Sequence, residues 1–383
     1  MSSLDRVPVR QAEAEEARLA DHRLTQLVIK PTVFCYHKCP YCDPRQDYYK
    51  EMLESRRDEL RLFPAEGDRS QTPGHMPLDM AVRTIRQAAT LGMKSLQLSG
   101  GDPLMYPQLL EVIREGARHP GVFVFMNSVG TGITSEKARE IIAAGLGAWN
   151  FSVDTLDPIK YERLRGVRNG LAKIMEAIEV VREAAADWPE FCINYMTVIT
   201  KQNFHDIPNV LRHCLDTGVA SIYLMNVYGD TSGASLLDEQ EVNEFRDEVV
   251  PLMLSILREH HVPDIVQTNA ATVLGSFYAR ENSDSNYARG IYWPDMESAK
   301  KACGVPNYYA LVEPDGRVLP CCLVEISHEG GVGNVSDGGL AHVWTDGGYA
   351  AFRRDRIPFC QRCSSPRNRT LGLIPKMCRQ FNE

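Results

Sequence analysis

The sequence predicts an α/β protein in which a partial (β/α)6 TIM-like barrel is followed by a small cysteine-rich domain. Six apolar, strand-like runs lie between residues 27 and 227, and each is accompanied by a helix-like stretch. This alternation is typical of right-handed βαβ units and a parallel sheet. Glycines and polar residues gather just after several runs, where barrels place their chemistry. From Cys303 onward cysteines, glycines and prolines replace the alternation, as in small domains that need more than an apolar core.

The strand-like runs are short and are separated by amphipathic stretches. The helix-like stretch Asp79–Leu91 has apolar residues at helical spacing and ends before Gly92. Beyond the last run, Glu239–His261 has the pattern of one long helix, and residues 276–299 have that of a polar loop or lid. The predicted strands are Leu27–Phe34, Ser95–Leu98, Val122–Met126, Ala148–Val153, Phe191–Val198 and Ser221–Val227.

Length and composition place these elements in a multidomain protein of the cytoplasm. We expect a polar extension (1–26), the barrel (27–265), a linker or lid (266–302) and the cysteine-rich domain (303–383). The net charge of −8 argues against a nucleic-acid partner. No apolar run approaches the roughly 18 residues that cross a bilayer, and we find no secretory signal. The 11 cysteines are therefore expected to be metal ligands, catalytic groups or core residues rather than disulfides.

Three cysteines in "CYHKCPYC" follow the first predicted strand. Cys35, Cys39 and Cys42 lie at spacings of four and three residues. A structural zinc site closes with four protein ligands, whereas three thiolates on a four-iron cluster leave one iron open to a substrate or cofactor. The pattern predicts such an open iron–sulfur site at the barrel mouth. The alternatives are a zinc site with a distant fourth ligand and three unrelated cysteines.

The cysteine spacing, with Tyr41 before the last cysteine, resembles the signature of the radical S-adenosylmethionine (SAM) superfamily. The resemblance implies a 4Fe-4S cluster whose open iron chelates SAM, and a 5′-deoxyadenosyl radical that removes hydrogen from a substrate. Later segments extend it: "LSGGDPL" (98–104), "FSVDTLDPIKYERLRG" (151–166) and "NYMTVITKQN" (194–203) resemble the family's SAM-facing segments. Asp102 stands where glutamate is commoner. The implied SAM-binding residues are Tyr41, Gly100, Gly101, Asp102, Ser152, Asp154, Arg165 and Asn194.

The C-terminal cysteines resemble the SPASM/twitch extension of radical SAM enzymes. Cys303 and Cys321, the last residue of "DGRVLPC", form a C-x12-G-x4-C pattern, and Cys360-x2-Cys363 follows. The dense cysteine block of a full SPASM domain is missing, so we expect one auxiliary 4Fe-4S cluster on Cys303, Cys321, Cys360 and Cys363. Four thiolates close a cluster, which favours electron transfer or a structural role. A zinc ribbon on the same ligands is the alternative, and Cys322 and Cys378 have no assigned role.

The twitch resemblance implies an oxidoreductase or isomerase that acts on a carbinol C–H bond of a sugar or aminocyclitol, as in antibiotic biosynthesis. Flavodoxin or ferredoxin is the expected electron donor. Only 26 residues precede the first predicted strand, too few for the leader-binding domain of many peptide maturases, so we expect a small substrate. A maturase of ribosomal peptides (RiPPs) is the alternative within the family. A non-enzymatic zinc-binding scaffold is the alternative outside it.

Cys192 decides which product the sequence predicts. Side chains alternate along a strand, so Cys192 shares a face with Asn194. If Asn194 faces SAM, the Cys192 thiol also faces the barrel interior and can return a hydrogen atom to the opposite face of a substrate radical, which gives epimerisation. The alternative is a buried core residue. Without a thiol donor the radical is oxidised to a ketone.

Overall fold

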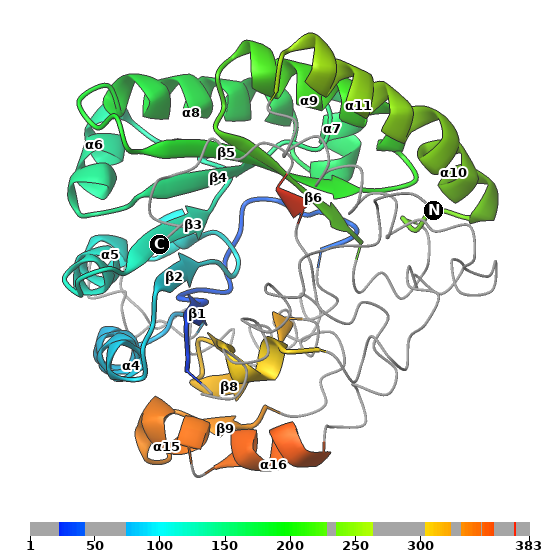
Figure 1. The fold of residues 1–383 in the computed structure, drawn as a ribbon. Coiled ribbons are helices and arrows are strands. Elements are labelled where there is room, and N and C mark those ends of the chain that lie inside the picture. The colour runs from blue at the N-terminus through cyan, green and yellow to red at the C-terminus, as the bar shows by residue number, and fades with distance from the viewer. Residues whose placement is uncertain are drawn as a thin grey trace, which may run out of the picture.

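The computed structural model describes residues 23–42, 74–227, 235–262, 303–322, 331–345, 347–355 and 371–372. In these residues a ten-stranded sheet has the order β10-β6-β5-β4-β3-β2-β1-β7-β8-β9, and the strands from β6 to β7 are parallel. The predicted α/β partial barrel is therefore confirmed (Figure 1). The strands are β1 (Gln26–Ile29), β2 (Ser95–Leu98), β3 (Phe123–Asn127), β4 (Ala148–Ser152), β5 (Cys192–Ile199), β6 (Ser221–Asn226), β7 (Tyr309–Val312), β8 (Arg317–Leu319), β9 (Gly333–Asn334) and β10 (Leu371–Gly372).

Helices cover the outer side of the curved sheet (Figure 1). Each turns an apolar stripe toward the strands, as α4 does with Ala81, Ile85 and Ala88. No helix in the described ranges is long and apolar enough to cross a membrane. The helices are α4 (Leu78–Thr90), α5 (Leu109–Ala117), α6 (Ser135–Ala143), α7 (Pro158–Arg165), α8 (Gly170–Ala184), α9 (Ile207–Asp216), α10 (Glu239–Glu244), α11 (Val250–Glu259), α15 (Gly339–Thr345) and α16 (Gly348–Asp355).

Two predicted elements differ from the structure, and a proline lies at each difference. The first strand ends at Ile29 rather than Phe34, because Pro31 has no N–H for the sheet. The segment 30–34 thereby leaves the sheet and leads to the cysteines. The predicted helix Glu239–His261 is divided into α10, a π-helical turn at Phe245–Val249 and α11. Pro251 in the first turn of α11 cannot donate to the preceding turn.

The C-terminal region joins the barrel sheet through β7. This strand pairs with β1 in parallel, with Gln26 opposite Tyr309 and Ile29 opposite Val312. All four residues of β7 are buried, as expected of a parallel strand covered on both faces. The run "YALV" was a sequence signal for such a strand, but nothing in its local pattern names β1 as the partner.

The two faces of the sheet have different neighbours. The outward side chains of the barrel strands, such as Leu27, Leu96 and Trp149, are fully buried in the main core under the helices. The inward side chains form smaller clusters. On β1, Val28 packs with β7 and β8, and at the amino end of β5 Cys192 packs with Ala148. Residues that alternate with the outward set therefore line the inner face of the barrel.

Candidate active site

The cysteine loop, residues 30–42, follows β1 at the carboxyl edge of the sheet. The Cys42 N–H donates to the Cys39 carbonyl over 3.1 Å, and the His37 N–H lies 3.4 Å from Cys35 Sγ. Local turns thus bring three thiols into one loop, as predicted from their spacing. Within the described ranges, no three His, Cys, Asp or Glu side chains are arranged to hold a single metal ion.

Gly100 and Gly101 place the end of β2 directly against this loop. The Gly101 N–H donates to the Thr32 carbonyl over 2.9 Å, and the Asp102 N–H donates to the Phe34 carbonyl over 2.6 Å. A Cβ at position 101 would lie 2.1 Å from the Phe34 oxygen, and Gly100 has a φ of +113°. Both positions therefore require glycine, because the backbones approach too closely for a side chain.

We expect the substitution Gly101→Ala to displace the cysteine loop. Its Cβ clashes with a backbone carbonyl at 2.1 Å, and a backbone oxygen cannot turn away as a flexible side chain can. Iron and sulfide content after anaerobic reconstitution should fall by more than half. Gly132→Ala is the control for backbone strain without a clash: its φ of +74° disfavours alanine, but a Cβ there meets nothing within 4 Å, so cluster content should be unchanged. Full cluster content in Gly101→Ala would contradict the proposed close approach.

Asp102 is held by its own protein neighbours. Its carboxylate accepts hydrogen bonds from the Ser128 hydroxyl (2.7 Å) and from the backbone N–H groups of Leu104 (3.0 Å) and Val129 (3.2 Å). Burial raises the pKa of Asp102, while these hydrogen bonds oppose the shift. The carboxylate thus ties the ends of β2 and β3 together. Sequence reasoning missed Ser128, which lies just after β3.

Tyr41, Asp154 and Arg165 form a buried group beneath the cysteine loop. Asp154 is fully buried just after β4, and its carboxylate accepts a hydrogen bond from the Tyr41 hydroxyl. Its second interaction is an ion pair with Arg165 Nε at 2.7 Å. The Arg165 guanidinium also lies 3.7 Å from Cys39 Sγ and 5.6 Å from the Tyr41 ring centre. The group therefore ties the cysteine loop to β4 and α7.

Electrostatics keep this group in one protonation state. Burial alone would lower the pKa of Arg165, but Asp154 and the other negative groups around it raise that pKa above its ordinary value. Burial raises the pKa of Tyr41 as well. Arg165 thus stays charged and Tyr41 stays a hydrogen-bond donor.

The ends of α7 and β5 position this buried group. α7 stops at Gly166, which has a φ of +62°, and the Lys38 N–H donates to the Arg165 carbonyl over 3.0 Å. Beyond β5, the fully buried Asn203 donates to the carbonyls of Asp154 and Val198, both at 2.8 Å. Sequence reasoning missed Asn203, although it lies inside the segment quoted for its resemblance.

Ser152 and Asn194 lie on the inner face, on neighbouring strands. Ser152 is half-buried at the end of β4, two residues before Asp154. Asn194 is buried, and its amide donates to Asn150 Oδ1 over 2.9 Å. In the register of the sheet Asn194 lies opposite Asn150. Asn194 therefore lies two residues closer to the amino edge of the sheet than Ser152.

Cys192 is the first residue of β5, at the amino edge of the sheet. It shares the inner face with Asn194, but it precedes Val198, whose N–H reaches Asp154, by six residues. At the rise of a strand this is about 20 Å. The sulfur takes part in a disulfide, contrary to the expectation from the sequence that the cysteines form none, and in that form it carries no S–H hydrogen. Its role as a hydrogen donor stays a prediction that requires the reduced thiol.

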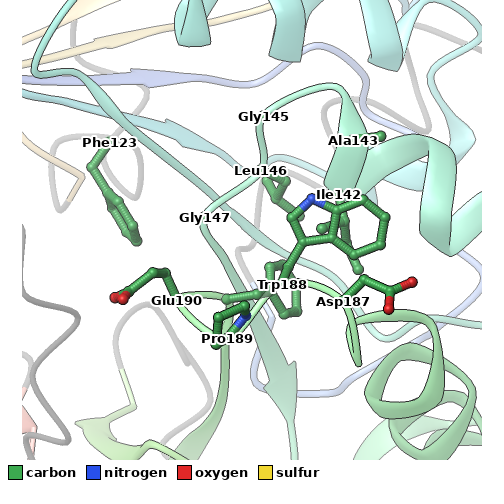
Figure 2. A pocket seen from close by; sticks show the side chains of 11 residues that line it. Phe123, Ile142, Ala143, Gly145, Leu146, Gly147, Asp187, Trp188, Pro189 and Glu190 are labelled. Carbon is green, nitrogen blue, oxygen red and sulfur yellow. The ribbon is translucent and has the colours of Figure 1, made fainter.

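A pocket of about 350 Å³ has Phe191, the neighbour of Cys192, in its lining and no residue of the cysteine loop. Its lining includes Phe123 at the start of β3 and the segment 187–191 before β5. Figure 2 shows Trp188 between the labelled Asp187 and Glu190. Phe123 begins β3, and residues 187–191 precede β5. This pocket therefore lies at the amino edge of the sheet, opposite the candidate active site.

The described auxiliary cysteines meet at the junction with the barrel. Cys303 precedes β7 and Cys321 follows β8, and both pack against the cluster of Val28, Tyr309, Leu311 and Leu319. Cys322 packs against the same cluster. These three thiols therefore lie on the inner-face side of β1. The predicted ligands Cys360 and Cys363, and also Cys378, lie outside the described residues.

The fold and site define a partial barrel with a three-cysteine loop at its mouth and an added cysteine-rich region. The model of the radical SAM superfamily matches residues 29–214, and that of the SPASM iron-sulfur cluster-binding domain matches residues 303–364. The chain belongs to the radical SAM superfamily and carries a SPASM domain.

Similar proteins agree with this assignment. The AdoMet-dependent heme synthase of Methanosarcina barkeri is 25% identical over 74% of this chain and 77% of its own. A PqqA peptide cyclase of Xanthomonas campestris is 25% identical over 88% of this chain and 78% of its own. SuiB of Streptococcus suis bound to S-adenosylmethionine has a TM-score of 0.58 at 16% identity, covering 96% of this chain and 76% of its own. AdoMet-bound anSMEcpe has a TM-score of 0.57 at 16% identity, covering 93% and 95%.

The two domains imply SAM, a SAM-binding 4Fe-4S cluster and auxiliary cluster chemistry as cofactors. The residues of this chain fit the first cluster. Its loop supplies three thiols, the donor set that leaves one iron of a four-iron cluster without a protein ligand, and Arg165 stands beside one of them. Cys35, Cys39 and Cys42 would hold that cluster. Cys303 and Cys321 would contribute to the auxiliary one.

Proposed function

We propose that this protein removes a hydrogen atom from a carbinol C–H bond of a sugar or aminocyclitol, and that the substrate leaves as an epimer or a ketone. The observation that supports it is the three-thiol loop, braced by the buried Tyr41–Asp154–Arg165 group, above an inner face that carries polar side chains. The reduced cluster with SAM supplies a hydrogen-abstracting radical. The chain itself positions the loop and receives the substrate.

The positioning is divided among three contacts. Gly100 and Gly101 let the end of β2 approach the loop backbone, and Asp154 fixes Tyr41 and Arg165 beneath it. These contacts would hold the iron-binding thiols in one place relative to the inner face. A fixed distance between radical source and substrate is what a selective hydrogen abstraction needs.

A peptide maturase is the second candidate, and it is as plausible on the comparisons as the sugar proposal. Relatives include PqqA peptide cyclases, and similar structures include SuiB bound to the precursor peptide SuiA, with a TM-score of 0.57 at 18% identity. AnSMEcpe has likewise been solved with bound peptides. These activities belong to those proteins. For this chain they define the substrate class against which the sugar proposal must be tested.

Deuterium transfer tests the proposal. Anaerobically reconstituted protein is incubated with SAM, dithionite and either carbon-deuterated aminocyclitols and sugars or carbon-deuterated peptides. We expect deuterium in 5′-deoxyadenosine with the ring compounds alone. Deuterium transfer only from peptides would replace the sugar proposal by the maturase. Zinc without labile sulfide in the same preparation would support the non-enzymatic scaffold instead.

The product ratio tests Cys192. If its reduced thiol returns hydrogen to the substrate radical, Cys192→Ala should convert most of the epimer into ketone, because the radical would then lose a proton and pass its electron to the auxiliary cluster. Cys214→Ala is the matched control, since Cys214 is buried on α9 among core residues. An unchanged epimer-to-ketone ratio in Cys192→Ala would remove this residue from the mechanism.

A further inference from the structure

One level of the inner face is polar across the four strands β3 to β6 and at the residues that directly follow β7, β1 and β2. The sheet register sets Asn127 opposite Asn150, Asn150 opposite Asn194, and Asn194 opposite Ser221. On the other side, Val28 pairs with Gln97 and Leu311, so the residues two positions later share the next level. We call this level the polar layer, and it consists of Glu313, Lys30, Ser99, Asn127, Asn150, Asn194 and Ser221.

Hydrogen bonds orient the amides within the polar layer. Asn194 Nδ2 donates to Asn150 Oδ1, and Asn150 Nδ2 donates to Asn127 Oδ1, each over 2.9 Å. The row therefore ends in an amide donor at Asn127 and an amide acceptor at Asn194. Within the described residues neither of these two atoms has a protein partner. Asn127 is half-buried.

The polar layer ends in an ion pair, so this end contains charged groups but has no net charge. Lys30 Nζ lies 3.6 Å from Glu313 Oε1, and the Glu313 side chain is fully buried. Because the two charges offset each other, the layer offers no excess charge to a ligand. It therefore suits neutral hydroxyl groups better than phosphate, whose desolvation requires a compensating positive charge.

The polar layer lies between an apolar level and the mouth. One level toward the amino edge, Phe125, Ala148 and Cys192 belong to an apolar cluster. Asp154, beneath the cysteine loop, lies four residues beyond Asn150, which corresponds to about 13 Å along the strand. Between these levels the inward residues Met196 and Tyr223 are half-buried, whereas the outward Tyr195 and Ile222 are fully buried. The inner face thus borders accessible space.

We propose that the polar layer is the floor of the substrate site and binds a polyhydroxylated ring through its hydroxyl groups. A hydroxyl both donates and accepts, so it can pair with Asn127 Nδ2 and with Asn194 Oδ1 alike. This assigns Asn194 to the substrate instead of to SAM, the partner that the resemblance implies. An apolar peptide side chain at this depth would leave these amide atoms unpaired. The proposal deepens the proposed function and rests on it, because it assumes a substrate beneath the cysteine loop.

Asn127→Leu tests this floor with little change of side-chain size. Leucine has no polar atom, so the outward donor of the polar layer is lost. The probes are the uncharged rings glucose and myo-inositol, followed by saturation-transfer NMR and calorimetric titration on the reconstituted full chain. We expect the wild-type protein to bind at least one ring, and Asn127→Leu to bind it about 10-fold more weakly, as for one lost hydrogen bond. Asn127→Ser serves as a second variant if the leucine form does not fold.

The matched control is Phe125→Leu, one level below on the same strand, which should bind the ring as the wild-type protein does. Equal binding by the wild-type protein and by the folded Asn127 variants overturns the floor. Binding of the peptide acetyl-Gly-Gly-Ser-Gly-Gly-amide but of neither ring also overturns it. SAM cleavage by the wild-type protein with dithionite is measured separately. Ring binding without any formation of 5′-deoxyadenosine would contradict the proposed function but would still support the polar layer as a binding site.

Discussion

Cys35→Ala should abolish the formation of 5′-deoxyadenosine from SAM. The cysteine loop supplies three thiols, and removing one leaves a four-iron cluster with two protein ligands, so the cluster is lost or loses its single open iron. The loop is otherwise intact in this variant, because the Tyr41–Asp154–Arg165 group beneath it does not depend on the Cys35 sulfur. Anaerobic reconstitution, dithionite reduction and mass spectrometry of the nucleoside product measure the loss.

The control for this experiment is Cys214→Ala. Cys214 is fully buried on α9, so its loss should lower the free energy of unfolding by about 1 kcal/mol through a small cavity and leave SAM cleavage unchanged. Undiminished 5′-deoxyadenosine from Cys35→Ala would mean that the loop does not hold the SAM-cleaving cluster. Equal loss in both variants would point to a general effect on folding.

The sequence predicts the barrel strands well because each has its own local pattern. Alternating strands and helices identified β1 to β6, and the departures occur where a proline removes a backbone donor, at Pro31 and Pro251. The pairing of β7 with β1 lay beyond local reasoning. The edge that a strand joins depends on the whole sheet, and the four apolar residues of β7 do not specify a pairing partner.

The sequence predicted individual residues of the candidate site but not the contacts between them. The motif resemblance named Tyr41, Asp154 and Arg165 separately, and the structure brings them into one buried group. Asn127 and Asn150 were missed because the amide row exists only in the register of three paired strands. Strand alternation gave the face of Cys192 correctly. Alternation does not give the position of a residue along the barrel axis. Cys192 is the first residue of β5 and lies at the amino edge, away from the cysteine loop.

Asp154→Ala should lower the free energy of unfolding by about 3–5 kcal/mol, the cost of leaving a buried charge without its partner. The Arg165 side chain is 8% exposed and pairs with Asp154 at 2.7 Å. In the variant its guanidinium stays buried without a carboxylate, and the Tyr41 hydroxyl loses its acceptor. Urea unfolding followed by circular dichroism measures the change. SAM cleavage should fall as well, since Arg165 and Tyr41 both brace the cysteine loop.

Two further variants separate the buried charge from a general effect of losing a carboxylate. Asp157→Ala removes an exposed cap of α7, where Asp157 accepts from the backbone of Ile159 and Lys160, and it should lower the free energy of unfolding much less than Asp154→Ala does. The double variant Asp154→Ala with Arg165→Ala should be more stable than Asp154→Ala alone, because the uncompensated charge is gone, yet it should still cleave SAM poorly. If Asp154→Ala unfolds at the same urea concentration as Asp157→Ala, the group beneath the loop contributes no special stability, and the loop must be positioned by its contacts with Gly100 and Gly101.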